Sequence, residues 1–155
     1  MHAAWLCAFL TAAAPASLSY AQWNVTVPSR PRDVPTNITL EPGAIYGITA
    51  RGSWTDWYIH TDANGYENAV MKPFDHLKRV PHARWFALVC CIGAAAHTPS
   101  TQLCSVIGAS GNLSVPKAAA PGQKAHCFAN DAYSMYWNNY GSLSVEVRKI
   151  VDQLR

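Results

Sequence analysis

Charge is scarce in this chain: Asp, Glu, Lys and Arg make up 14% of its 155 residues, whereas soluble domains average about 25%. Twelve basic and nine acidic residues leave a formal net charge of only +3. The basic residues are scattered, and only Lys78-Arg79 and Arg148-Lys149 stand side by side. A nucleic-acid-binding protein carries a dense basic patch, so the composition argues against that class. A weakly charged surface offers neutral polar groups and aromatic rings to water, which suits uncharged ligands rich in hydroxyl groups.

Long apolar runs are also missing. After residue 21 no run approaches the roughly 20 residues that a membrane-spanning helix needs. The apolar run at residues 3–14 is too short to span comfortably, and Ser19 and Ala21 follow it in the pattern of a signal-peptide cleavage site. A buried N-terminal helix is the alternative, but Pro15 interrupts it. We therefore expect a signal peptide at residues 1–21, one mature domain at residues 22–155, and secretion into the periplasm or the extracellular space.

The cysteines lack the paired Cys-x-x-Cys spacing of a zinc site, so a metal role for them is weak. Cys7 lies in the predicted signal peptide, which leaves four cysteines in the mature chain. An even number in an oxidising compartment predicts two disulfides. Cys90 and Cys91 are neighbours in a strand-like run and should point to opposite faces. Each needs a different partner, and the sequence leaves open which of them takes Cys104 and which takes Cys127.

No convincing long amphipathic helix is present, and short strand-like segments separated by turn residues dominate. This pattern predicts an all-β fold, a β-sandwich or jelly roll. In the segment 44–50 the even positions form a candidate inward face, and the apolar run 85–92 reads as a strand buried on both faces. Residues 55–82 show no sustained period and predict a long loop, while residues 148–155 have a brief helical pattern. The other expected strands are 22–27, 37–40, 103–107, 112–115, 124–128 and 142–147.

One loop concentrates oxygen donors. Asp131 is followed seven and eight residues later by Asn138 and Asn139, just before the last strand-like run. Carboxylate and amide oxygens are ligands that Ca²⁺ prefers, and the alternating acids of an EF-hand are absent. The same loop carries four aromatic residues, Tyr133, Tyr136, Trp137 and Tyr140. The loop therefore predicts a calcium-dependent carbohydrate site, and its alternative interpretation is a simple turn rich in Asn and Gly.

The pattern Asp131-x6-Asn138-Asn139-x-Gly141-Ser142 resembles the calcium loop of the PA-I-type galactophilic lectins, which have a galactose-binding-domain-like β-sandwich. Trp23, Pro42-Gly43, Trp54 and the segment 87–93 follow in the same order as in that family. The resemblance implies that Asp131, Asn138 and Asn139 bind Ca²⁺ through side chains, and that Met135 and Trp57 bind it through backbone carbonyls. It also implies that galactose hydroxyls complete the calcium shell.

The sugar contacts that the resemblance implies are Asp131, Asn138, Trp57 and His76. His76 is assigned by position only, because the family's His-Pro-x-Gln segment is replaced here by Pro73-Phe74-Asp75-His76. This departure affects sugar identity more than calcium binding. Chain-length differences also mean that the family's tetramer cannot be carried over, so a homo-oligomer stays an open expectation.

The leading hypothesis is thus a non-enzymatic, secreted lectin for galactose-containing glycans. The alternative is a structural or protein-interaction β-sandwich that has lost sugar recognition. A small glycoside hydrolase would need paired acids, for which Asp56, Asp62, Glu67 and Asp75 are the candidates. The histidines show no metal-binding or catalytic spacing, and we expect no catalytic residue.

Overall fold

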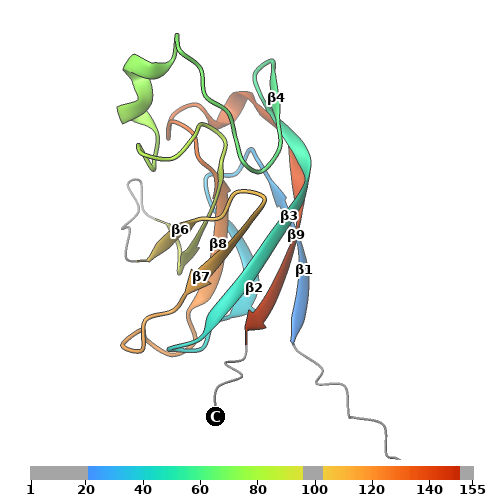
Figure 1. Ribbon diagram of the computed structural model, residues 1–155, viewed down its shortest axis with the longest axis vertical. Coiled ribbons are helices and arrows are strands. Elements are labelled where there is room, and N and C mark those ends of the chain that lie inside the picture. The colour runs from blue at the N-terminus through green and yellow to red at the C-terminus, as the bar shows by residue number, and fades with distance from the viewer. Residues whose placement is uncertain (1–20, 96–102, 151–155) are drawn as a thin grey trace, which may run out of the picture.

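Two antiparallel sheets face each other in the computed structural model, which describes residues 21–95 and 103–150 (Figure 1). Residues 1–20 of the predicted signal peptide, which include Cys7, and residues 151–155 of the tail lie outside the described residues. The first sheet has the order β1 (Gln22–Pro28), β9 (Asn139–Ile150), β3 (Ile45–Asp56) and β4 (Ile59–Thr61), and β7 (Ser110–Ser114) also pairs with β3. The second has the order β2 (Val34–Thr39), β8 (Lys124–Ala129), β5 (Leu88–Ile92) and β6 (Cys104–Val106). Two 3-10 helices complete the fold: η1 (Lys72–Leu77) and η2 (Tyr136–Asn138).

The pairing of β3 with β9 is the longest in the first sheet. Its register runs without a break from Ile45 opposite Ile150 to Asp56 opposite Asn139. Side chains alternate across a strand, and the predicted inward face is confirmed, because Tyr46, Ile48 and Ala50 are buried. The sandwich core therefore follows directly from a period of two residues.

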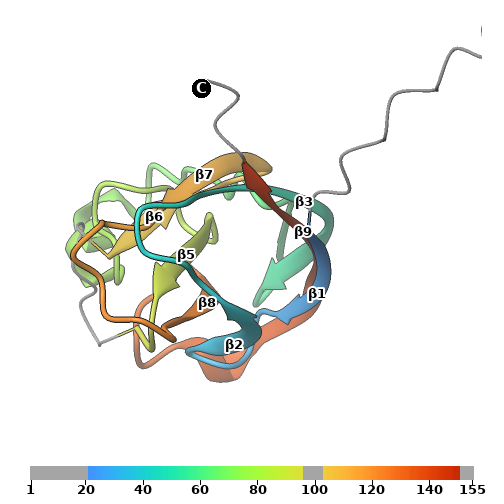
Figure 2. The same cartoon turned by 90° about the horizontal axis from the view of Figure 1, so that it is seen from below.

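Trp54 belongs to this core and has no exposed surface. Its indole N–H donates to the carbonyl of Phe86 at 3.1 Å, and the two rings meet edge to face at 5.9 Å. A buried Trp needs such a partner for its N–H. The contact joins the first sheet to the segment that enters β5. Figure 2 looks along the strands and shows the two sheets closing around this interior.

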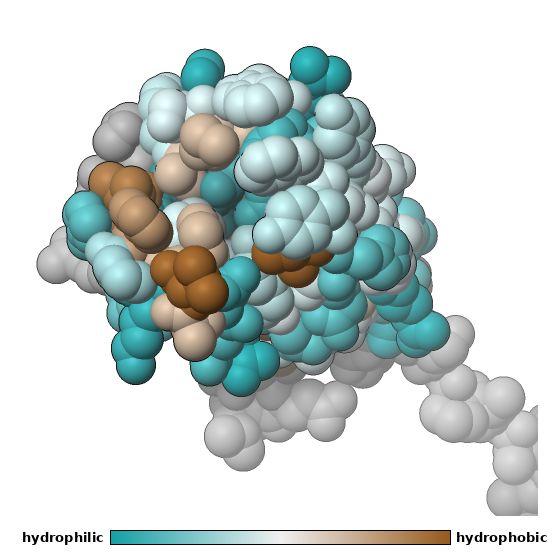
Figure 3. Space-filling model, turned by 90° about the horizontal axis from the view of Figure 1, so that it is seen from above, coloured by the Kyte–Doolittle hydropathy of each residue, from teal (hydrophilic) through white to brown (hydrophobic). Residues whose placement is uncertain are grey.

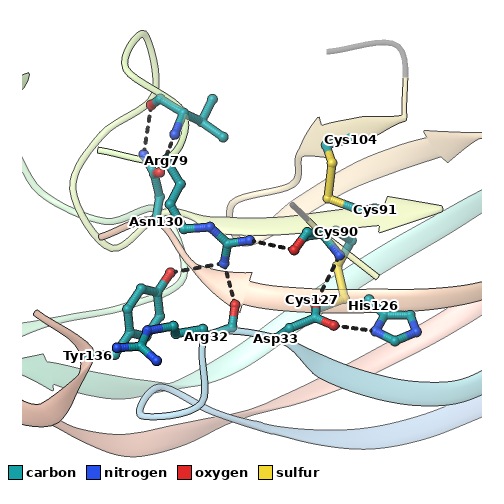
Figure 4. The surroundings of a disulfide bond; sticks show 12 residues. Arg32, Asp33, Arg79, Cys90, Cys91, Cys104, His126, Cys127, Asn130 and Tyr136 are labelled. Carbon is teal, nitrogen blue, oxygen red and sulfur yellow. Dashed lines mark hydrogen bonds and ion pairs between the residues drawn. A yellow bond between two sulfur atoms is a disulfide. The ribbon is translucent and has the colours of Figure 1, made fainter. Parts of the chain in front are cut away.

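The two predicted disulfides are present, and they join Cys90 to Cys127 and Cys91 to Cys104. Cys90 belongs to the main core between the sheets, whereas Cys91 packs in a smaller cluster with Val89 and Phe128. Neighbouring residues of a strand therefore point to opposite faces, as expected. Figure 4 shows the two bridges on the opposite sides of β5.

Three expectations from the sequence were wrong in detail. The strand expected from residue 85 begins at Leu88, because Phe86 has a φ of +58° and cannot extend it. The segment 55–82 is not all loop, since it holds β4 and η1. The expected helical tail continues β9 as far as Ile150, where Lys149 and Ile150 pair with Tyr46 and Ile45.

Several of the connections between strands gather at one end of the sandwich. The β3–β4 turn, η1 and the segment before β9 lie together at the top of Figure 1, whereas β1 begins and β9 ends at the opposite end. Among the described residues no helix is long and apolar enough to cross a membrane.

Candidate functional site

Asp131 follows β8 at the end where these connections meet, and only 2% of it is exposed. One carboxylate oxygen accepts the N–H of Ala132 at 2.6 Å, and the other accepts the side-chain N–H of Asn139 at 3.0 Å. Burial, followed by the negative charge of Asp56, raises the pKa of Asp131 to about 7 despite these two bonds. A carboxylate in this position gains strongly from a nearby positive charge.

Asn138 and Asn139 are buried beside it, with 4% and 0% of their surface exposed. The amide group of Asn139 donates to Asp131 and, at 3.2 Å, to the carbonyl of Ser29. The Oδ1 atoms of both asparagines are buried and have no hydrogen-bond partner among the described residues. A buried polar atom without a partner costs about 1–3 kcal/mol. Two such acceptors next to a buried carboxylate form a set of oxygens that a donor or a cation would stabilise.

A short helical turn presents these amides. Met135 donates its N–H to Ala132 at 2.9 Å, and the Met135 carbonyl accepts the N–H of Asn138 at 3.2 Å. The hydroxyl of Tyr136 donates to the carbonyl of Ala129 at 2.5 Å, which ties η2 to β8. Because a carbonyl oxygen has two lone pairs, Met135 can still accept a second partner.

Arg79 holds the base of this loop. The backbone N–H of Arg79 donates to the carbonyl of Asp131 at 3.1 Å, and the guanidinium lies 3.7 Å from the centre of the Phe128 ring. The same guanidinium donates to the hydroxyl of Tyr136 at 3.3 Å and to the carbonyl of Arg32 (Figure 4). A planar cation with several donors can serve several segments at once. We assign Arg79 a structural role on these contacts.

Asn130 joins the loop to the preceding segment. It accepts the N–H of Val80 at 2.9 Å and donates to the carbonyls of Val80 and Arg84, each at 3.0 Å. Three bonds from one buried amide hold residues 80–84 against the start of the loop. The neighbouring Asp131 is therefore fixed from both sides.

The β3–β4 turn closes the other side of the site. Its two residues are Trp57 and Tyr58, and the N–H of Trp57 donates to the carbonyl of Asn138 at 3.2 Å. Trp57 has a φ of +52°, where two-residue turns usually place Gly or Asn. A bulky residue in this region is strained, and such strain clusters at functional sites. Trp57 is nevertheless 70% exposed, so burial of its ring does not explain its presence.

A cavity of about 320 Å³ opens beside these groups, close to the lower limit of roughly 300 Å³ for small-molecule sites. Asp56, Asp131 and Asn138 line its polar side. The remaining wall is largely apolar and includes Trp57, Tyr58, Met71, Phe74, Leu77 and Trp85. Figure 3 looks onto this end and shows hydrophobic side chains standing among polar ones. The arrangement can hold a ligand with both hydroxyl groups and an apolar face.

The chemistry of the donor set fits Ca²⁺. One carboxylate, two amide oxygens and backbone carbonyls are all oxygen ligands, which suit this cation. The two unpartnered amide oxygens are the direct observation in favour. No group of three or more His, Cys, Asp or Glu side chains gathers in the part of the chain that the structure describes, so a nitrogen- or sulfur-rich metal site has no support there.

The residues predicted from the sequence occupy this region with one difference. Asp131, Asn138, Met135 and Trp57 line the cavity, and Asn139 contacts Asp131. His76 lies exposed on η1, where its Nδ1 is 3.0 Å from the carbonyl of Pro73, and it does not line the cavity.

Two residues at the site were not expected there. The sequence suggests Asp56 only as a candidate hydrolytic acid and gives no role to Tyr66. In the structure, the hydroxyl of Tyr66 donates to Asp56 at 2.5 Å. The one sequence feature that could have placed Asp56 at the site is its position directly before Trp57, a predicted calcium ligand. Trp137 is 64% exposed and lines a different hollow with Arg30 and Tyr133.

No protein-family profile matches the chain, and no curated protein matches it. Among solved structures it is similar to the N-terminal domain of EclA, a PllA-like lectin, with a TM-score of 0.57 and 20% sequence identity. The similarity covers 86% of this chain and 100% of that domain. At this identity the likeness shows a shared fold. The β-sandwich expected from the sequence is confirmed, and it is a fold that a lectin also uses.

Proposed function

We propose that this protein is a secreted, calcium-dependent lectin for galactose-containing glycans. The observation that supports it most is the pair of buried amide oxygens, on Asn138 and Asn139, beside buried Asp131. In the part of the chain that the structure describes, neither oxygen has a hydrogen-bond partner. A bound Ca²⁺ supplies positive charge to these oxygens and open coordination positions that two neighbouring sugar hydroxyls can fill. The lectin fold of the structural neighbour agrees with this function.

The residues that would hold the ion are Asp131, Asn138 and Asn139 through side chains, and Met135 and Trp57 through carbonyls. Asp131 and Asn138 would also accept hydrogen bonds from the sugar hydroxyls. Asp131 and Asn138 line the cavity, whereas Asn139 contacts Asp131 without lining it, so a sugar can reach Asp131 and Asn138. Outer hydroxyl contact by His76 stays a prediction, because His76 does not line the cavity.

The aromatic wall supports the carbohydrate part of the proposal. Trp57 and Tyr58 are 70% and 75% exposed, and their rings meet at 5.5 Å. Ligand sites combine aromatic walls with a few placed polar groups, and a pyranose ring offers an apolar C–H face together with hydroxyls. One such site engages few groups, so tight binding to a cell surface would need several copies acting together.

Secretion is supported by the two disulfides, since such bonds persist in oxidising compartments. A non-enzymatic role is supported because three of the four candidate hydrolytic acids are already engaged by other residues. Asp62 accepts bonds from Asn64, Glu67 pairs with Arg84, and Asp75 pairs with Lys78. These three acids have structural partners, and only Asp56 lines the same cavity as Asp131.

The test is retention of the mature chain on immobilised galactose in calcium buffer, followed by elution with EDTA. We expect retention that EDTA abolishes, and loss of retention in Asn138→Ala. Lys117→Ala, at an exposed position outside the cavity, is the matched control and should behave as the parent. Binding that survives EDTA would contradict the mechanism. A blank glycan array beside clear calcium binding would instead select an interaction module without sugar recognition.

A further inference from the structure

Asp56 is an acidic side chain at this site that the proposed ligand set does not include. It is the last residue of β3 and pairs directly with Asn139 of β9. Opposed residues of an antiparallel pair share one face of the sheet, with Cβ atoms about 4.5–5.5 Å apart. Asn139 in turn donates to Asp131 at 3.0 Å. The register therefore places Asp56 on the same face as the amide that holds Asp131.

Two observations of geometry place Asp56 and Asp131 in one site. Both line the same cavity, and Asn139, which lies opposite Asp56 in the sheet, donates to Asp131 at 3.0 Å. Ion pairs among the described residues go to other acids, namely Glu41, Asp33, Glu67, Asp75 and Glu146. Two carboxylates that share a partly buried site repel each other unless a cation joins them.

Tyr66 fixes the orientation of Asp56. Its hydroxyl donates to one carboxylate oxygen of Asp56 at 2.5 Å, and its backbone N–H donates to the carbonyl of Trp85 at 2.8 Å. The Tyr66 ring lies 6.3 Å from the ring of buried Phe86. Burial and the bond to Asp56 raise the pKa of Tyr66 well above its usual value, so the hydroxyl remains a donor. The bond engages one oxygen of Asp56, and among the described residues no ion pair or second side-chain hydrogen bond to this carboxylate is found.

We propose that Asp56 is a second anionic group of the cation site, acting directly or through one water molecule, and that Tyr66 is its positioning residue. The inference rests on the proposed calcium function and deepens it. The two buried, unpartnered amide oxygens are the independent sign that a cation belongs there. A second carboxylate doubles the formal charge of the site, and Ca²⁺ affinity rises with the number of charged ligands.

The experiment is calorimetric titration of the mature chain with Ca²⁺, supported by Tb³⁺ luminescence, which needs no sugar. Asp56→Asn keeps the shape of the side chain and removes its charge, so we expect Kd to rise by about tenfold or more. Tyr66→Phe keeps the carboxylate and removes its donor, and we expect a smaller rise. Glu67→Gln is the matched control, because Glu67 is an exposed acid that does not line the cavity. It should bind as the parent does.

Stability without calcium provides a second readout. Removing one of two repelling charges should leave the melting temperature of Asp56→Asn in EDTA equal to or above that of the parent, which also shows that the variant folds. Unchanged Kd in folded Asp56→Asn would overturn the inference. If Asp131→Asn still abolished binding in that case, the calcium function would stand without Asp56. Absence of calcium binding in the parent chain would overturn the proposed function itself.

Discussion

Calcium binding should weaken sharply as pH falls below neutrality. The pKa of Asp131 is raised to about 7, first by burial and then by the charge of Asp56. A metal ligand must be deprotonated, so protons compete with Ca²⁺ at this carboxylate. At about pH 8 this competition is small, at about pH 6 it raises the apparent Kd roughly tenfold, and at about pH 5 roughly 100-fold.

The same shift gives the calcium-free protein the opposite pH dependence of stability. A carboxyl group whose pKa is higher in the folded chain than in the unfolded one holds its proton more tightly when folded. The contribution of Asp131 to stability is therefore fully present below the unfolded pKa of 3.8 and is lost as pH rises through about 7. The full contribution of Asp131 is roughly 4 kcal/mol, at 1.36 kcal/mol for each pKa unit.

Two assays check this reasoning. Calorimetric titration between pH 5 and pH 8, in buffers that do not chelate calcium, measures the apparent Kd. Urea unfolding in EDTA over pH 4 to pH 8 measures the stability of the calcium-free chain. The Asp131→Asn variant should lose the part of the pH dependence of unfolding free energy that Asp131 contributes. It should also bind little calcium at any pH. A Kd that is flat across this range would refute the assignment of Asp131 as the titrating ligand.

Three further outcomes are expected. Asn138→Leu should lose calcium binding but raise the free energy of unfolding in EDTA by about 1 kcal/mol, because it removes an unpartnered buried oxygen; a loss of stability there would contradict this. Trp57→Gly should relieve the positive φ, raise stability by about 1 kcal/mol, and lose galactose retention while calorimetry still shows calcium binding. Replacing Cys91 and Cys104 together by Ala should lower the free energy of unfolding by about 3 kcal/mol in urea titrations, and an unchanged midpoint would show that this bridge does not stabilise the fold.

The sequence was informative where structure follows from local geometry. Alternation fixes which face a side chain occupies, so burial of Tyr46 and Ile48 and the opposite directions of Cys90 and Cys91 could be predicted. The spacing of Asp131 and Asn138 likewise marked a single loop, and both line one cavity.

Long-range pairing could not be read in the same way. Asp56 lies opposite Asn139 only because β3 and β9 pair in one register, and no local pattern specifies a pairing across 83 residues. The same pairing explains the wrong helical expectation after Arg148, since Lys149 and Ile150 stay paired with Tyr46 and Ile45 when β9 remains extended. Tertiary pairing outweighs a weak helical propensity in so short a segment.

Burying the polar groups of the site lowers the free energy of unfolding of the chain, and a bound cation would offset this loss. Unpartnered oxygens on Asn138 and Asn139 cost about 1–3 kcal/mol each, and repulsion between Asp56 and Asp131 adds to this. The two disulfides and the long β3–β9 ladder stabilise the fold against this cost. A ligand present at 100 times its Kd stabilises a folded chain by about 2.7 kcal/mol. If the proposed function holds, calcium would both stabilise this end of the sandwich and prepare it to receive a sugar, because the same oxygens serve both.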